Sequence, residues 1–133
     1  MHSLSQNRLG AEGAEALAPA LAANGALTSL NLGDNQLCGL DKYGDGTYSA
    51  EGITAIADAL RVNGALTKLS LAQNKLEEEG TKAICEALEQ NTTLKELDIS
   101  GDHNGSNINI GGRAGAKHVA KMLGVNGSLT EVR

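Results

Sequence analysis

The sequence predicts an α/β solenoid, in which a short strand and a helix repeat along the chain and stack on the copies beside them. Two observations predict this fold. A strand-like motif of regularly spaced leucines recurs down the chain, and a second motif with helical spacing alternates with it. A third observation agrees with both. The 133 residues include no Trp and no Phe, so the core must be built from thin layers of Leu, Ile, Val and Ala.

The strand motif has aliphatic residues at its first, fourth and sixth positions. Its complete copies add asparagine at the ninth position and leucine at the eleventh. The copies begin at Leu27, Leu66, Leu94 and Leu129, and the tail of an earlier copy occupies residues 4–9. In the first of these copies, Leu30 and Leu32 alternate with polar residues. This period of two predicts a short strand with one buried face.

The helical motif has a glycine, two aliphatic residues at intervals of four, and an asparagine three positions further on. Its copies run from Gly13 to Asn24, Gly52 to Asn63, Gly80 to Asn91 and Gly115 to Asn126. Aliphatic residues four apart share one face of a helix. We expect Asn–Gly pairs such as Asn63 and Gly64 to supply the left-handed residues that end each helix.

One strand–helix unit cannot bury its apolar face alone, so neighbouring units must stack. Stacked strands lie about 4.8 Å apart, whereas packed helices need about 8–10 Å between their axes. This mismatch predicts a right-handed horseshoe segment with parallel strands on the concave face and helices on the convex face. We expect a single domain with a partial repeat at 1–26, repeats at 27–65, 66–93 and 94–128, and a partial strand at 129–133.

These motifs cover nearly the whole chain, and they resemble the ribonuclease-inhibitor-like class of leucine-rich repeats. The same class occurs in NOD-like receptors and in the Ran GTPase-activating protein. Because most members bind proteins, the resemblance implies a module for protein–protein interaction. It leaves other interpretations open: a GTPase-activating or otherwise regulatory domain, a fragment of a larger receptor-like protein, or an engineered scaffold.

Two repeats are longer than the third. The strand motifs begin 39, 28 and 35 residues apart, which leaves about 11 and about 7 extra residues relative to a repeat of about 28. We place the insertions at Cys38–Tyr48 and at roughly His103–Gly111, both between a strand and a helix and therefore on one rim. Insertions of this kind often line a binding surface, although neutral drift of loops that cost little to lengthen also explains them.

The partner-binding surface is predicted on the concave face and on this rim. Side chains at the third and fifth motif positions point away from the core. Together with residues of the insertions they give the predicted contacts Ser29, Asn31, Tyr43, Tyr48, Lys68, Ser70, Glu96, Asp98 and His103. We expect both tyrosine rings to bury area while their hydroxyls stay wet. The neighbouring carboxylates favour a basic segment of a protein as the partner.

The first insertion also resembles an EF-hand calcium loop. Asp41, Asp45 and Ser49 match ligand positions one, five and nine of such a loop. Calcium needs six to eight oxygens, usually including a carboxylate at position twelve. That position is Gly52, and Glu51 lies one residue short. We therefore expect a polar turn without a metal, and calcium remains the weaker alternative.

No pattern of catalytic residues stands out. The three histidines, His2, His103 and His118, are scattered, and none has the spacing of a metal site. Neither a Ser–His–Asp context nor a phosphate-binding glycine loop is present. We expect no enzymatic activity and no cofactor.

The ninth-position asparagines have a structural interpretation. Asn7, Asn35 and Asn74 are expected to bond the backbone of adjacent coils, because buried backbone groups need partners. In the third copy Asp102 stands at this position, which predicts a distorted turn.

Two cysteines are too few for a disulfide framework. Cys85 stands where other repeats have alanine, so we expect a small buried side chain. Cys38 opens the first insertion and is expected to be exposed. With neither a secretory signal nor an apolar run of about 18 residues, we expect a cytoplasmic protein.

The net charge of −5 disfavours nucleic acid and anionic membranes as partners. The ends of the array lack a polar capping unit. Because open ends expose core and an unpaired strand edge, we expect self-association through the uncapped ends.

Overall fold

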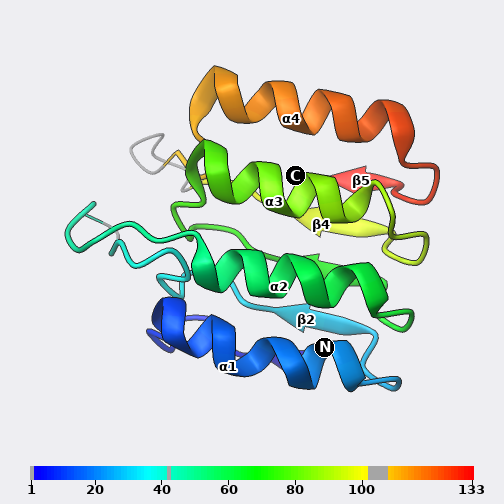
Figure 1. Ribbon diagram of the computed structural model, residues 1–133, viewed down its shortest axis with the longest axis horizontal. Coiled ribbons are helices and arrows are strands. Elements are labelled where there is room, and N and C mark those ends of the chain that lie inside the picture. The colour runs from blue at the N-terminus through cyan, green and yellow to red at the C-terminus, as the bar shows by residue number, and fades with distance from the viewer. Residues whose placement is uncertain (1, 42, 102–107) are drawn as a thin grey trace.

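The computed structural model describes residues 2–41, 43–101 and 108–133. Within these residues five strands and four helices alternate. In chain order they are β1 (His2–Ser3), α1 (Gly10–Ala23), β2 (Ser29–Asn31), α2 (Glu51–Val62), β3 (Lys68–Ser70), α3 (Glu77–Leu88), β4 (Glu96–Asp98), α4 (Gly112–Val125) and β5 (Glu131–Val132). The strands form one parallel sheet in chain order, and the helices form a second layer against it (Figure 1). The predicted α/β repeat architecture is confirmed.

The three central strands, β2, β3 and β4, turn the same motif position towards the helices. Leu30, Leu69 and Leu97 pair in register across three strands, and all three are buried. The residues on either side of each leucine are half-buried on the opposite face. Burying one leucine side chain stabilises the fold by about 1.5–3 kcal/mol. The alternation therefore gives the sheet one apolar face inside the molecule and one polar face outside it.

Gly52, the motif glycine of α2, marks a close approach between neighbouring coils. A Cβ atom at Gly52 would lie 2.4 Å from the carbonyl oxygen of Ala11 and 2.9 Å from the Cβ of Ala14. Both partners belong to α1, so only glycine lets α2 pack this closely against it. Gly52 thus allows α1 and α2 to pack closely side by side.

The prediction that Asn–Gly pairs supply left-handed residues at the helix ends is wrong. Asn63 has an extended backbone, with φ −74° and ψ 122°, and Gly64 is not among the residues with positive φ. The Asn63 side chain terminates the helix instead. Its Oδ1 accepts the backbone N–H groups of Ala65 and Leu66, and its Nδ2 donates to the carbonyl oxygen of Leu21 in the preceding coil. Asn91 and Asn126 repeat this arrangement.

A second row of asparagines follows the strands, and its predicted structural role is confirmed. Asn74 Oδ1 accepts the backbone N–H of Asn35 in the preceding coil at 2.9 Å. Asn74 Nδ2 donates to the carbonyl oxygen of Leu32 at 3.0 Å. Asn35 forms the same pair of bonds with the coil before it. This asparagine ladder satisfies backbone groups that the turns leave unpaired, as buried polar groups require.

The ladder continues at Asn109, where the sequence analysis assigned Asp102. Asn109 Oδ1 accepts the backbone N–H of Asn74 at 3.1 Å, and its Nδ2 donates to the carbonyl oxygens of Leu71 and Ile99. The prediction assumed that the ladder residue follows Ile99 after three positions, as in the other repeats. In this repeat the extra residues lie before the ladder asparagine, between Ile99 and Asn109. In the first long repeat, by contrast, the insertion follows the ladder residue Asn35. The predicted site residue His103 and the predicted ladder residue Asp102 lie outside the described residues.

Candidate binding surface

The sheet face that points away from the helices carries the side chains predicted to be concave. We call it the open sheet face, and its members are Ser29, Asn31, Lys68, Ser70, Glu96, Asp98 and Glu131. They lie in rows because the strands are in register, so that Lys68 is paired with Glu96, and Glu96 with Glu131. Seven residues from four strands thus share one surface.

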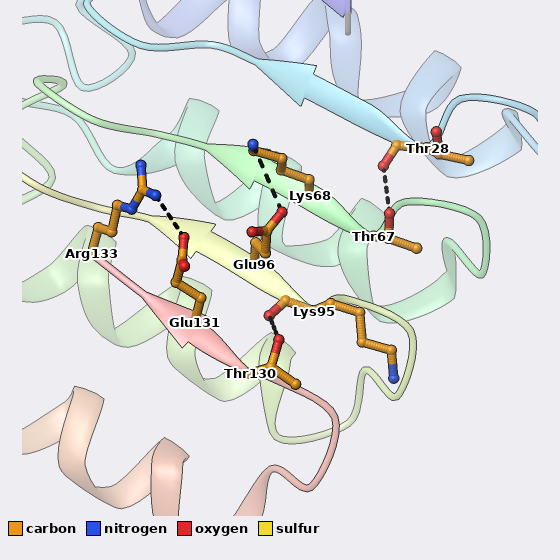
Figure 2. A network of polar contacts seen from close by, with 8 residues as sticks. All are labelled: Thr28, Thr67, Lys68, Lys95, Glu96, Thr130, Glu131 and Arg133. Carbon is orange, nitrogen blue, oxygen red and sulfur yellow. Dashed lines mark hydrogen bonds and ion pairs between the residues drawn. The ribbon is translucent and has the colours of Figure 1, made fainter.

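The charges on this face are arranged around two adjacent carboxylates. Lys68 Nζ lies 3.7 Å from Glu96 Oε2, and Arg133 lies 2.9 Å from Glu131 through its guanidinium (Figure 2). Both pairs are well exposed, and exposed ion pairs stabilise a fold by about 0–1 kcal/mol. Their carboxylates therefore contribute little to folding and are accessible to a partner.

A groove of about 170 Å³ crosses these strands. Its polar lining consists of Asn31, Lys68, Ser70, Glu96, Asp98, Glu131 and Arg133. It brings together five of the predicted contact residues. Ser29 does not line it, and the Ser29 hydroxyl is shielded from solvent without a hydrogen-bond partner in the described part of the chain.

The fifth-position side chains also hold the turns that follow the strands. Asp98 Oδ1 accepts the backbone N–H of Ser100 at 3.0 Å and its hydroxyl at 2.6 Å. Asn31 Oδ1 accepts the backbone N–H of Gly33 at 2.8 Å. In the part of the chain that the structure describes, Asp98 Oδ2 and Asn31 Nδ2 take part in no hydrogen bond. The sequence predicted partner contacts at these positions but not this role in the turns.

A threonine row beside the open sheet face was not identified from the sequence. The Thr67 hydroxyl donates to the carbonyl oxygen of Thr28, and the Thr130 hydroxyl donates to that of Lys95, each at 3.1 Å (Figure 2). Threonine recurs at the second position of the strand motif, and this recurrence could have predicted the row. These bonds link neighbouring coils and so fix the spacing of the charged rows.

The Tyr48 hydroxyl is bonded to the protein backbone, whereas a solvated hydroxyl was predicted from the sequence. The hydroxyl donates to the carbonyl oxygen of Leu76 at 2.5 Å and accepts the backbone N–H of Gly80 at 3.1 Å. The tyrosine ring packs against the core. The desolvation that accompanies this packing raises the pKa of Tyr48 above its ordinary value. The end of the first insertion therefore anchors the next coil.

Cys38 is fully buried, which contradicts the expectation that it is exposed. Burial raises the pKa of the Cys38 thiol to about 12. Cys85 is buried as predicted, and burial likewise raises its pKa to about 12. Both thiols therefore remain protonated near neutral pH, and neither has the thiolate character that reactive cysteines need.

Removing the Tyr48 hydroxyl tests the anchoring role. Tyr48→Phe is expected to lower the free energy of unfolding by about 1 kcal/mol, because the hydroxyl bonds the carbonyl oxygen of Leu76, just before α3, and the backbone N–H of Gly80 within it. Urea denaturation measures this loss. Thr47→Val, which removes an exposed hydroxyl from the neighbouring residue, should change stability by less than about 0.5 kcal/mol. Equal effects of the two substitutions would show that the hydroxyl does not anchor α3.

The first insertion forms a closed loop that presents Tyr43. Asp41 Oδ1 accepts the backbone N–H groups of Tyr43 and Asp45, both at 2.9 Å, and the backbone N–H of Asp41 donates to the carbonyl oxygen of Asp45. Leu40 and Gly46 form an antiparallel bridge below them. Tyr43 is 77 % exposed.

The candidate ligands for calcium, the weaker alternative for this loop, are Asp41, Asp45, Ser49 and Glu51. Two of them accept hydrogen bonds from the backbone of the loop itself. Asp41 closes the loop, and Ser49 Oγ accepts the backbone N–H of Glu51 at 3.2 Å. Across 2–41, 43–101 and 108–133, no group of three or more His, Cys, Asp or Glu side chains is placed to hold a metal ion.

In the part of the chain that the structure describes, no helix has the length and apolar character needed to cross a membrane.

Comparison with known proteins identifies the repeats. A family model described as Leucine Rich repeat matches residues 3–18, 65–85 and 90–101. No curated protein matches the chain. The strand–helix repeats are thus leucine-rich repeats, as the resemblance implied.

Two solved structures are similar to the chain. The actin-binding site 2 of leiomodin-1 is 25% identical with a TM-score of 0.75, and the match covers 99% of this chain and 69% of that one. A tropomodulin C-terminal domain from structural genomics of Caenorhabditis elegans is 15% identical with a TM-score of 0.63. That match covers 90% of this chain and 62% of the other, and it shows the fold alone.

Proposed function

We propose that the chain is a protein-binding module, and that its partner lies across the open sheet face and the rim that carries the first insertion. The observation that carries this proposal is the row of charged side chains that cross three strands in register. They are held at fixed spacing by the sheet, yet they do little for its stability.

The dimensions of the groove favour a protein over a small molecule. Small-molecule sites usually enclose about 300–1,000 Å³ and are mostly apolar. The groove on the open sheet face holds about 170 Å³ and is lined mainly by polar side chains. A shallow polar surface of this kind suits contact with another protein surface.

The charge arrangement favours a basic segment of the partner. Glu96 and Glu131 stand on adjacent strands, and like charges in neighbouring strands repel each other. Lys68 and Arg133 offset this repulsion only through exposed ion pairs. A lysine or arginine from a partner would relieve the repulsion further, while Asp98 adds a third carboxylate to the same groove.

Actin is the first partner to test. The chain is similar over 99% of its length to a domain named as an actin-binding site. We expect the chain to bind actin in monomeric or filamentous form, measured by calorimetry and by cosedimentation. Absence of binding to both forms would exclude actin and leave the partner to be found elsewhere.

Charge reversal identifies the face that binds. The double variant Glu96→Lys with Asp98→Lys should weaken actin binding by about tenfold or more, because it reverses two charges in the groove. The matched control is Glu86→Lys with Glu89→Lys, which makes the same net charge change on α3 and the residue that follows it. Circular dichroism establishes that both variants are folded. If the control weakens binding and the groove variant does not, the helices form the interface.

A further inference from the structure

A second cavity lies at the rim, separate from the groove on the open sheet face. It has a volume of about 640 Å³, which falls within the range of about 300–1,000 Å³ for ligand sites. The cavity is lined by Gln6, Arg8, Asp34, Gln36, Asp41 and Tyr43. It shares no lining residue with the groove. We call it the rim cavity.

The backbone holds four of these residues in an unusual conformation. Gln6 and Arg8 flank Asn7, with φ values of 61° and 52°. Asp34 and Gln36 flank the next ladder asparagine, with φ values of 53° and 57°. Left-handed conformations are uncommon for residues other than glycine. The asparagine ladder enforces them, since the backbone N–H of Asn7 is bonded to the asparagine side chain of the next coil at 2.8 Å.

The first insertion closes the other side of the rim cavity. Asp41 lines the cavity, and its Oδ1 is occupied by two backbone N–H groups of its own loop. Within the described ranges, no hydrogen bond or ion pair uses its second carboxylate oxygen. The Oδ1 bonds fix the turn that presents the Tyr43 ring. The lining is therefore formed before a ligand arrives, which lowers the entropic cost of binding.

The charged groups of the rim cavity are not paired with each other. Within the described ranges, neither Arg8 nor Asp34 takes part in a side-chain hydrogen bond or an ion pair. The Gln6 and Gln36 amides likewise have no such bond. A cation, a carboxylate and two amides that line one cavity without protein partners form a set of donors and acceptors for a ligand.

We infer that the rim cavity binds an extended peptide segment that carries one Lys or Arg side chain with an Asp or Glu beside it. This inference rests on the proposed function, because the segment belongs to the bound protein. The basic side chain lies between Asp34 and Asp41 and beside the Tyr43 ring, which adds a cation–π contact. The acidic side chain pairs with Arg8 through charge-assisted hydrogen bonds.

The remaining features select a peptide over other ligands. The Gln6 and Gln36 amides can each donate and accept, which matches the N–H and C=O groups of a peptide main chain. Among the described lining residues, two carboxylates stand against one guanidinium, a balance that favours a ligand with a basic group.

Titration of the isotopically labelled chain with two short peptides tests the inference by NMR. The probes are acetylated and amidated Gly-Arg-Gly-Glu-Gly and its neutral counterpart Gly-Gln-Gly-Gln-Gly. We expect saturable shifts confined to residues 5–9 and 33–46, with binding of the charged peptide about fivefold or more above that of the neutral one. Equal affinity for both peptides, or shifts centred on residues 96–98, would overturn the inference.

Variants separate the contributions of the two charges. Asp34→Asn should weaken binding of the charged peptide by about fivefold or more. Arg8→Gln should remove the preference for Gly-Arg-Gly-Glu-Gly over a third peptide, Gly-Arg-Gly-Gln-Gly, in which only the Glu is replaced. The control is Asp58→Asn on α2, whose exposed carboxylate pairs with Arg61 and should leave binding unchanged. An equal loss with the control would contradict the assignment to the rim cavity.

The test of the rim cavity is independent of the test with actin. The groove variant Glu96→Lys with Asp98→Lys should keep its affinity for the charged peptide, because neither residue lines the rim cavity. Peptide binding without actin binding would support the rim cavity and overturn actin as the partner. Actin binding that survives the loss of all peptide binding would overturn the rim cavity alone.

Discussion

Asn74→Ala is expected to lower the free energy of unfolding by about 3–5 kcal/mol, since each buried polar group left without a partner costs about 1–3 kcal/mol. Asn74 is fully buried. Its Oδ1 accepts the backbone N–H groups of Asn35 and Leu37, and its Nδ2 donates to the carbonyl oxygens of Leu32 and Leu71. Alanine would leave several of these groups unsatisfied, and urea denaturation measures the loss.

The matched control is the exposed end of the same ladder. Asn7 donates to the carbonyl oxygens of Leu4 and Ser5 within its own turn, and solvent can replace these bonds. Asn7→Ala should therefore cost less than about 1 kcal/mol. A loss below about 1 kcal/mol for Asn74→Ala as well would show that the ladder does not hold the coils together.

Leu69→Asp is expected to unfold the chain, because it places an unpaired charge in the core beneath the central strand. Leu69 is 1 % exposed and is paired in register with Leu30 and Leu97. A loss above about 4 kcal/mol exceeds most single substitutions and is a large fraction of the stability of an ordinary domain. Far-ultraviolet circular dichroism and thermal melting measure the outcome.

The control stands one position along the same strand. Ser70 faces the other way, and the equivalent position in the next strand is already occupied by an aspartate, Asp98. Ser70→Asp should change stability by less than about 1 kcal/mol. A Leu69→Asp protein that kept the parent's spectrum and melting temperature would mean that the inward and outward positions are wrongly assigned.

The periodic parts of the fold could be predicted from the sequence. Each structural position recurs, so Leu30, Leu69 and Leu97 identify one buried row even though a single short strand would be ambiguous. The helical motif did the same for the helices. Their order and the parallel sheet follow from stacking, because one strand–helix unit cannot bury its apolar face alone.

The errors fall where the repeat is broken or where one sequence fits two local structures. An Asn–Gly pair is compatible with a left-handed helix end and with an extended asparagine whose side chain bonds the backbone, and only the packed neighbour favours the second. The motif spacing from Ile99 gave Asp102 as the ladder residue. The spacing alone does not indicate whether the insertion lies before or after the ladder asparagine, Asn109.

The insertions have no period from which burial can be predicted. Tyr43 and Tyr48 therefore looked equivalent in the sequence, although Tyr48 lies at the base of the loop and bonds α3. Cys38 was misjudged for the same reason. The rim cavity was missed although a signal was present. Polar residues flank both Asn7 and Asn35 in the sequence, and the ladder holds these flanking residues along one rim.

The central claim is that another protein is recognised on the open sheet face. Two-dimensional NMR of the isotopically labelled chain, titrated with unlabelled actin, tests it most directly. We expect the signals of residues 29–31, 68–70 and 96–98 to be perturbed first, together with those of residues 40–46. Perturbation confined to residues 51–62 and 77–88 on the helices, or no perturbation at saturating actin, would contradict it.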